Sequence, residues 1–205
     1  MIVGFESYHD KYDFSGVKGV IHVGAHHGQE YTTYLHYFGA HISTHWFEPL
    51  PEAFSVLKSN LEGKSGVKLY NCALGPEESR MRIWRDSGNE GQSSSLMKPK
   101  DHVEQWSHIT FSHDEEVMVR KLDNLSIRDA NVLVIDAQGF ELEVLKGAKE
   151  TMSAIDHVFC EINSKEMYEG CPTVFDLNWF LEEIGFAKRE EWWTGSNWGD
   201  GYWSR

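Results

Sequence analysis

Several residues that could bind a nucleoside-like ligand follow the apolar runs of this chain. Gly24 ends the first run, and Gly28 follows shortly after it. Glu48 ends the second run, and Asp136 ends a fully apolar run that begins near residue 131. A glycine lets the backbone turn tightly against a ligand, and a carboxylate after the next strand can accept both hydroxyls of a ribose. This spacing favours a site for a nucleoside-type cofactor.

The third apolar run is followed by residues that suit the base of such a cofactor. Cys72 and Ala73 are small enough to border an adenine ring. The glycine turn departs from the dinucleotide pattern G-x-G-x-x-G, because His26 stands where that pattern has its second glycine. A nicotinamide-dependent oxidoreductase is therefore the less favoured alternative.

The apolar runs alternate with amphipathic stretches, which is typical of parallel strands joined by crossover helices. We expect strands at residues 17–23, 41–47, 67–71, 131–136 and 156–162, and helices at 28–38, 51–61, 140–152 and 173–184. Two final runs, 186–193 and 201–203, are joined by a short loop, which predicts an antiparallel edge hairpin. The sequence thus predicts an α/β fold in which the candidate residues gather at the carboxyl ends of a mostly parallel sheet.

Residues 76–116 interrupt this regularity. They contain a candidate hairpin around 81–84, a polar stretch rich in Gly and Ser, and a segment with several His and Trp residues. Long irregular insertions in compact domains are usually binding loops or lids, with disorder as the alternative. We expect a single domain over residues 1–205, with an inserted lid or substrate loop at 76–116.

The composition restricts the class of partner. The chain has 205 residues, with Lys plus Arg at 19 and Asp plus Glu at 32, so its formal net charge is −13. This charge disfavours nucleic acid as a partner. No stretch approaches the roughly 18 apolar residues of a membrane helix, and no leader pattern begins the chain, so we expect a cytoplasmic protein without membrane insertion. The eleven histidines are scattered, and no metal site is predicted.

Six blocks follow one another along the chain: VIHVGAHHG at 20–28, FEPLP at 47–51, NCALG at 71–75, SSSL at 93–96, KLD at 121–123, and IDAQGFE at 135–141 continuing to LKGA at 145–148. They resemble the successive blocks of the FkbM-type S-adenosylmethionine-dependent methyltransferases. The resemblance runs from about residue 18 to residue 163. It implies a Rossmann-like class I methyltransferase fold with a seven-stranded sheet and helices on both faces. It also implies O-methylation of a hydroxyl on a small molecule, sugar or glycan, with S-adenosylmethionine as cofactor.

The resemblance implies a role for each matching position. The glycine turn would hold the methionine part of the cofactor, Glu48 the ribose, and residues 72–73 the adenine, while serines of the insertion would close over it. The cofactor-binding positions would be His22, Gly24, Ala25, His26, Gly28, Glu48, Pro49, Cys72, Ala73, Ser94, Ser95, Asp136 and Ala137.

Asp136 is the first candidate to orient the acceptor hydroxyl or to accept its proton, directly or through a bound cation. The alternative general base is a histidine of the insertion, because the pKa of imidazole lies near neutrality. The sequence does not rank His102, His108 and His113, and we take His108 with Asp136 as the catalytic pair to test. Residues that could stack on a sugar or line its cleft are Trp106, Trp192, Trp193, Trp198, Trp203 and the strand end 161–163.

Three positions depart from the family pattern. His22 stands where many members have Asp, Val134 where Lys is common, and Gln138 where Glu is common. These departures keep a further alternative open, a binding module that retains the cofactor pocket and has lost turnover. The sequence leaves the oligomeric state open, a homodimer included.

Overall fold

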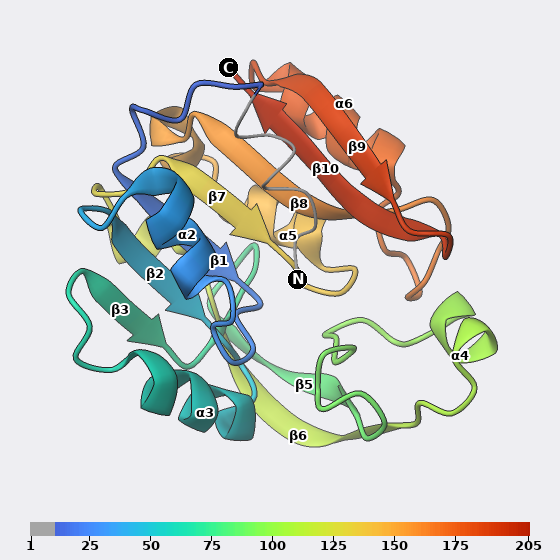
Figure 1. Ribbon diagram of the computed structural model, residues 1–205. Coiled ribbons are helices and arrows are strands. Elements are labelled where there is room, and N and C mark those ends of the chain that lie inside the picture. Colours follow the sequence, from blue (N-terminus) through green and yellow to red (C-terminus); the bar gives the residue numbers. More distant parts are fainter. Residues whose placement is uncertain (1–10) are drawn as a thin grey trace.

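Figure 1 shows the computed structural model of the protein, which describes residues 11–205. Its main element is a seven-stranded sheet. The strand order is β3-β2-β1-β7-β8-β10-β9. All neighbouring pairs are parallel except those of β10, which is antiparallel to β8 and β9. The strands are β1 (Gly19–Val23), β2 (Ser43–Phe47), β3 (Val67–Tyr70), β7 (Val132–Ile135), β8 (His157–Asn163), β9 (Ala187–Trp193) and β10 (Trp198–Ser204). The mostly parallel sheet and its antiparallel edge hairpin are therefore confirmed.

Helices cover both faces of this sheet, because alternate side chains of each strand point to opposite sides. Val132 and Val134 pack in one cluster with side chains of α2 (Tyr31–Phe38) and α3 (Pro51–Leu61). Leu133 and Ile135 pack in another cluster with α5 (Glu141–Lys146) and α6 (Val174–Glu183). All four β7 side chains have an exposed fraction of 0%. Burial on both faces explains why this strand is a continuous apolar run.

The insertion contains more regular structure than we expected. Strands β4 (Ala73–Leu74), β5 (Ser79–Asp86) and β6 (Phe111–Arg120) form a second sheet in the order β4-β6-β5. Only residues 87–110 are a connection, and this carries the short helix α4 (Asp101–Gln105). Strands β5 and β6 carry charged residues of both signs, so they do not appear as apolar runs in the sequence. These charged side chains pair between the two strands: Arg85 Nη1 lies 3.5 Å from a carboxylate oxygen of Glu115.

The predicted helix over 140–152 is shorter in the structure. Helix α5 ends at Lys146, and a separate 3₁₀ turn, η2, covers Thr151–Ala154. A second 3₁₀ turn, η1 (Leu122–Leu125), precedes β7. A Cβ atom added at Gly147 would lie 2.0 Å from the carbonyl oxygen of Gly75, so the backbone after β4 passes against the end of α5. Ala148 and Met152 still pack in the core after the helix ends, so the apolar periodicity continues although the helix does not.

Two further features of the described residues concern membrane-spanning helices and cysteines. Within residues 11–205, no helix is long and apolar enough to cross a membrane. Cys72, Cys160 and Cys171 are all buried and none forms a disulfide. Burial raises the pKa of the Cys72 thiol to about 11, so this side chain is a neutral core residue near pH 7.

Candidate active site

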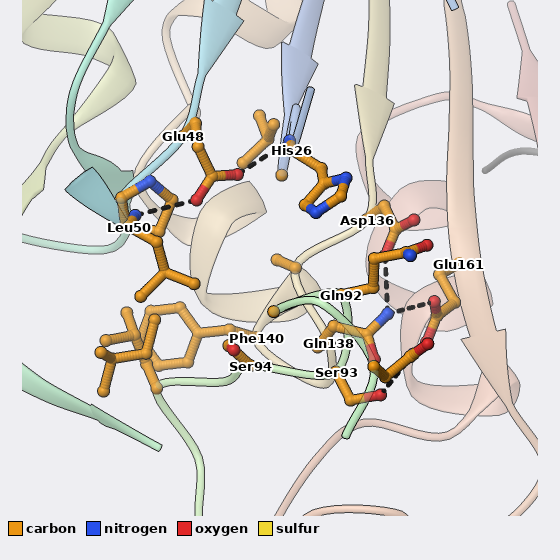
Figure 2. Close-up of a pocket in the computed structure, with 18 of the residues that line it drawn as sticks. His26, Glu48, Leu50, Gln92, Ser93, Ser94, Asp136, Gln138, Phe140 and Glu161 are labelled. Carbon is orange, nitrogen blue, oxygen red and sulfur yellow. Dashed lines mark hydrogen bonds between the residues drawn. The ribbon is translucent and has the colours of Figure 1, made fainter. Parts of the chain in front are cut away.

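A cavity of about 530 Å³ lies at the carboxyl ends of β1, β2 and β7 and beneath the connection 87–110 (Figure 2). This volume is in the range of small-molecule sites, and the position is the one where open parallel sheets bind ligands. The predicted site residues that line it are Gly24, Ala25, His26, Glu48, Pro49, Ala73, Ser94, His108, Asp136 and Ala137. The strand ends and the insertion therefore meet around one space.

The predicted positions His22, Gly28, Cys72 and Ser95 are not part of the cavity lining. His22 faces the helix layer of α2, where its Nδ1 lies 2.7 Å from the hydroxyl oxygen of Tyr34. Burial lowers the pKa of His22, so the ring is neutral in this interior position. Cys72 packs in the main core instead.

Gly28 and Ser95 support the cavity without reaching it. A Cβ atom at Gly28 would lie 2.7 Å from Cδ1 of Leu57, so the glycine allows α3 to pack against the turn that follows β1. The Ser95 hydroxyl donates to the carbonyl oxygen of Gln138 at 2.6 Å and links the insertion to the turn after β7.

The turn after β1 brings three strand ends together. Gly24 has φ of +79°, and a Cβ atom there would lie 1.7 Å from the carbonyl oxygen of Asp136. The amides of Gly24 and Ala25 both donate to the carbonyl oxygen of Phe47 at 3.0 Å, and the amide of Asp136 donates to the carbonyl oxygen of Val23 at 3.0 Å. Only glycine meets both the positive φ and the close approach.

Glu48 is held at the end of β2 by two backbone amides. Its Oε2 accepts from the amide of His26 and its Oε1 from the amide of Leu50, each at 2.8 Å (Figure 2). The side chain is 5% exposed. Burial raises the pKa of Glu48 to about 7, even though these two hydrogen bonds favour the ionised form. Each oxygen has a further lone pair, so the carboxylate can still accept hydrogen bonds from a ligand.

Gln138 joins two carboxyl groups at the centre of the cavity. Its Nε2 donates to Oδ1 of Asp136 and to Oε2 of Glu161, each at 2.7 Å (Figure 2). Glu161 is also hydrogen-bonded to Asp136, and burial together with the Asp136 charge raises the pKa of Glu161 well above its usual range. Glu161 therefore carries a proton when Asp136 is ionised. A Glu at position 138 would add a third carboxyl group, whereas the amide of Gln138 supplies two donors.

The turn after β7 is fixed by Glu141. Its Oε1 accepts from the amide of Ala137 at 3.1 Å and from the amide of Gly139 at 2.9 Å. Gln138 has φ of +51°, which is uncommon for a residue other than glycine. Burial raises the pKa of Glu141 to about 7. This buried carboxyl group thus holds a strained turn that aims the Gln138 amide into the cavity.

The polar stretch of the insertion folds into a loop around Asp86. The Asp86 carboxylate accepts from the amides of Asn89 at 2.8 Å and Ser93 at 2.7 Å. His26 Nε2 lies 3.0 Å from the carbonyl oxygen of Glu90, so the loop touches the turn after β1. Ser93 and Ser94 line the cavity at this side (Figure 2).

The candidate bases in the insertion are separated by the fold. His102, on α4, and His108 both line the cavity, His102 being buried and His108 exposed. His113 lies outside the lining, where its ring stacks on Trp84 with centroids 4.1 Å apart. Among the tryptophans considered, Trp106 and Trp198 line the cavity and the other three do not.

Several lining residues were not singled out by the sequence. They include Gln29, Glu30, Leu50, Asn89, Gln92, Ser93, Leu96, Phe140, Met167 and Tyr168. The Tyr168 hydroxyl lies 3.0 Å from Oε1 of Gln138. Tyr168 belongs to the connection between β8 and α6, in which no periodicity marks a functional residue. Leu50 and Phe140 could have been found, because they lie within the strand-end blocks FEPLP and IDAQGFE.

Residues 22–187 match the methyltransferase FkbM domain family. The chain belongs to this family. A 2-O-methyltransferase, NoeI of Sinorhizobium fredii (strain NBRC 101917 / NGR234), is 26% identical over 133 residues, which are 60% of this chain and 55% of that protein. The chain thus spans about half the length of this relative.

Solved methyltransferase structures share the fold of this family member. A methyltransferase FkbM from Methylobacillus flagellatus KT has a TM-score of 0.63 at 14% identity, covering 96% of this chain and 45% of that one. A SAM-dependent methyltransferase from Aquifex aeolicus has a TM-score of 0.51 at 11% identity, covering 97% and 87%. The class I methyltransferase fold is therefore confirmed.

Proposed function

We propose that this FkbM-family chain is an S-adenosylmethionine-dependent O-methyltransferase that acts on a hydroxyl of a sugar, glycan or other small molecule. The observation that carries the proposal is one continuous cavity in which Glu48 and the Gly24 turn face the same space as Asp136 and the histidines of the insertion. The 2-O-methyltransferase relative supports oxygen as the methyl acceptor.

The residues at the strand ends fit the cofactor. Gly24 lines the cavity with backbone alone, and Glu48 has free lone pairs for the two ribose hydroxyls. Ala73, Leu74 and Phe140 give the lining an apolar part that suits an adenine ring. When bound, S-adenosylmethionine would supply a methyl group that is already activated on a sulfonium.

Asp136 would orient the acceptor hydroxyl and take its proton. The reaction needs an acceptor oxygen aligned with the methyl–sulfur bond, in a space that excludes water. Gln138 and the protonated Glu161 hold the Asp136 carboxylate from one side. His102 and His108, which both line the cavity, are the alternative bases; burial lowers the pKa of His102, so its ring is neutral and able to accept a proton.

Calorimetric titration with S-adenosylhomocysteine tests the cofactor, with NADH as the control ligand. We expect micromolar binding of S-adenosylhomocysteine and none of NADH. Binding of NADH alone would support the oxidoreductase alternative and refute the proposal. Methyl transfer from labelled S-adenosylmethionine to a glycan panel then separates an enzyme from a binding module, which would bind the cofactor and transfer nothing.

The buried, unbridged cysteines support a reducing setting such as the cytoplasm.

A further inference from the structure

A buried carboxyl group to which the proposed reaction gives no role lies at the start of α2. Glu30 is 9% exposed and lines the cavity. It directly precedes the helix, yet its side chain caps none of the helix amides. Within residues 11–205, the Glu30 carboxylate forms no hydrogen bond and no ion pair. Burying a carboxylate without a partner is costly, so this side chain indicates a ligand that donates to it from the cavity.

The side chains close to Glu30 do not neutralise its charge. Burial lowers the pKa of His22, although the nearby Glu30 charge acts in the opposite direction, so this ring is neutral near pH 7. Burial and the Glu30 charge raise the pKa of Tyr34 well above its usual range, so its hydroxyl keeps its proton. Neither group therefore supplies the cation that stabilises a buried carboxylate best.

The position of Glu30 relates it to one end of the proposed cofactor. Residues 24–30 connect β1 to α2, and Glu30 is the only carboxylate among them. Glu48 ends β2 on the neighbouring strand, and the amides of His26 and Leu50 hold it. With the ribose at Glu48, the methionine part of the cofactor would extend along the connection between β1 and α2. Glu30 would then face the part of the cofactor that carries a primary ammonium group.

The other carboxyl groups of the lining have different partners. Asp136 accepts a hydrogen bond from Gln138 Nε2 at 2.7 Å and is also hydrogen-bonded to Glu161. Glu161 in turn accepts from Gln138 Nε2 at 2.7 Å. These contacts bind the two carboxyl groups to each other and to the turn after β7. Glu30 belongs to a different connection and takes no part in this network.

From this geometry we propose that Glu30 binds the α-ammonium group of S-adenosylmethionine and selects nucleosides that carry this group. The proposal rests on the proposed methyl transfer and adds a cofactor-binding residue outside the strand ends. An ammonium N–H donates to a Glu30 oxygen, and such charge-assisted hydrogen bonds are about twice as strong as neutral ones. The interaction is stronger in the buried setting of Glu30 than it would be in water. Proton transfer stays with Asp136, so the two carboxylates have separate roles.

Calorimetry with the whole unmodified protein tests this role through four nucleosides. S-adenosylhomocysteine carries both the ammonium and the carboxylate, and its decarboxylated analogue keeps only the ammonium. Its deaminated analogue keeps only the carboxylate, and methylthioadenosine has neither. We expect the deaminated analogue to bind about 10- to 100-fold more weakly than S-adenosylhomocysteine. Equal affinities for these two ligands would overturn the proposal.

Variants connect the preference for the ammonium to Glu30. Glu30→Gln should weaken both amine-bearing ligands by about 10- to 100-fold and should change the affinities of the other two by less than about threefold. Glu30→Asp keeps the charge on a shorter side chain and should recover part of the preference. Glu62→Gln is the matched control, because it removes the same charge from an exposed side chain that pairs with Lys58 on α3. It should leave all four affinities unchanged.

The outcomes distinguish the Glu30 role from the proposed function. Binding of S-adenosylhomocysteine with no loss in Glu30→Gln, or with an equal loss for all four nucleosides, refutes the Glu30 role alone. Failure of the unmodified protein to bind any of the four refutes both the Glu30 role and methyl transfer. Thermal unfolding without ligand verifies that each variant is folded, and the comparison of analogues on the unmodified protein needs no variant.

Discussion

The elevated pKa of Glu48 predicts that nucleoside binding depends on pH near neutrality. Burial raises this pKa to about 7 in the free protein. Two ribose hydroxyls donate hydrogen bonds, so they bind the ionised carboxylate better than the protonated acid. The carboxyl group is ionised above pH 7 and protonated below it. Affinity for S-adenosylhomocysteine should therefore be constant above about pH 8 and should fall as the pH decreases through 7.

The size of the effect follows from the pKa. If only the ionised form binds, the apparent Kd increases by a factor of one plus ten raised to the difference between pKa and pH. At pH 5.5 this factor is about 30, equivalent to about 2 kcal/mol at 1.36 kcal/mol per pKa unit. A Glu with an unshifted pKa would be almost fully ionised at both pH values, and its affinity would hardly change.

Calorimetry at pH 5.5, 6.5, 7.5 and 8.5 measures this dependence. Glu48→Gln should bind more weakly at high pH and should lose the dependence, because the amide does not titrate. Glu141→Gln is the matched control: its carboxyl group also has a pKa of about 7 but serves the amides of Ala137 and Gly139. It should keep the pH dependence. A flat profile in the unmodified protein, or an unchanged slope in Glu48→Gln, would refute the role of Glu48.

Three further predictions address catalysis and stability. Asp136→Asn should reduce kcat by at least about 100-fold, the usual contribution of a general base, while the Kd for S-adenosylhomocysteine stays within about threefold; unchanged turnover would exclude Asp136 as the base. Gly24→Ala should unfold or strongly destabilise the chain, since the new Cβ would lie 1.7 Å from a backbone oxygen. In Gly28→Ala the new Cβ meets leucine side chains that can move, so the free energy of unfolding should decrease by only about 1–3 kcal/mol. Equal melting temperatures for the two glycine variants would contradict this ranking. Asn163→Leu should melt at the same temperature as the unmodified protein or a few degrees higher, because a buried unsatisfied amide costs about 1–3 kcal/mol; a large decrease in Tm would show that Asn163 has a structural partner.

Local sequence patterns were sufficient to predict where the strands of the main sheet end. Residues 132–135 form an apolar run because both faces of β7 are covered by helices, and the polar residue that follows must lie at the sheet edge. The same reasoning predicts that Gly24, Glu48 and Asp136 lie together at this edge, and all three line the cavity. It did not separate residues that face the cavity from neighbours that face the core. His22 and Cys72 belong to the right strands, yet their side chains point into packed interiors.

The insertion could not be predicted in this way, because its structure depends on partners distant in sequence. Strands β5 and β6 alternate buried apolar residues with charges that pair across the ladder, so neither strand resembles the apolar runs of the main sheet. Helix α4 has only five residues and is held by Met167 and Ser196, both more than sixty positions away. No local pattern encodes such contacts.

Different segments of the chain line the two ends of the cavity, and this bears on which acceptor the protein would methylate. Under the proposed function, the strand ends would bind the cofactor, and α4, the connection after β8 and the β9–β10 turn would bind the acceptor. Changes in these three segments could alter the acceptor without disturbing the Gly24 turn or Glu48. Exchanging residues 97–110 for the corresponding segment of another family member should therefore change acceptor preference while the Kd for S-adenosylhomocysteine stays within about threefold. A parallel loss of nucleoside binding in a folded chimera would show that the two halves are not independent.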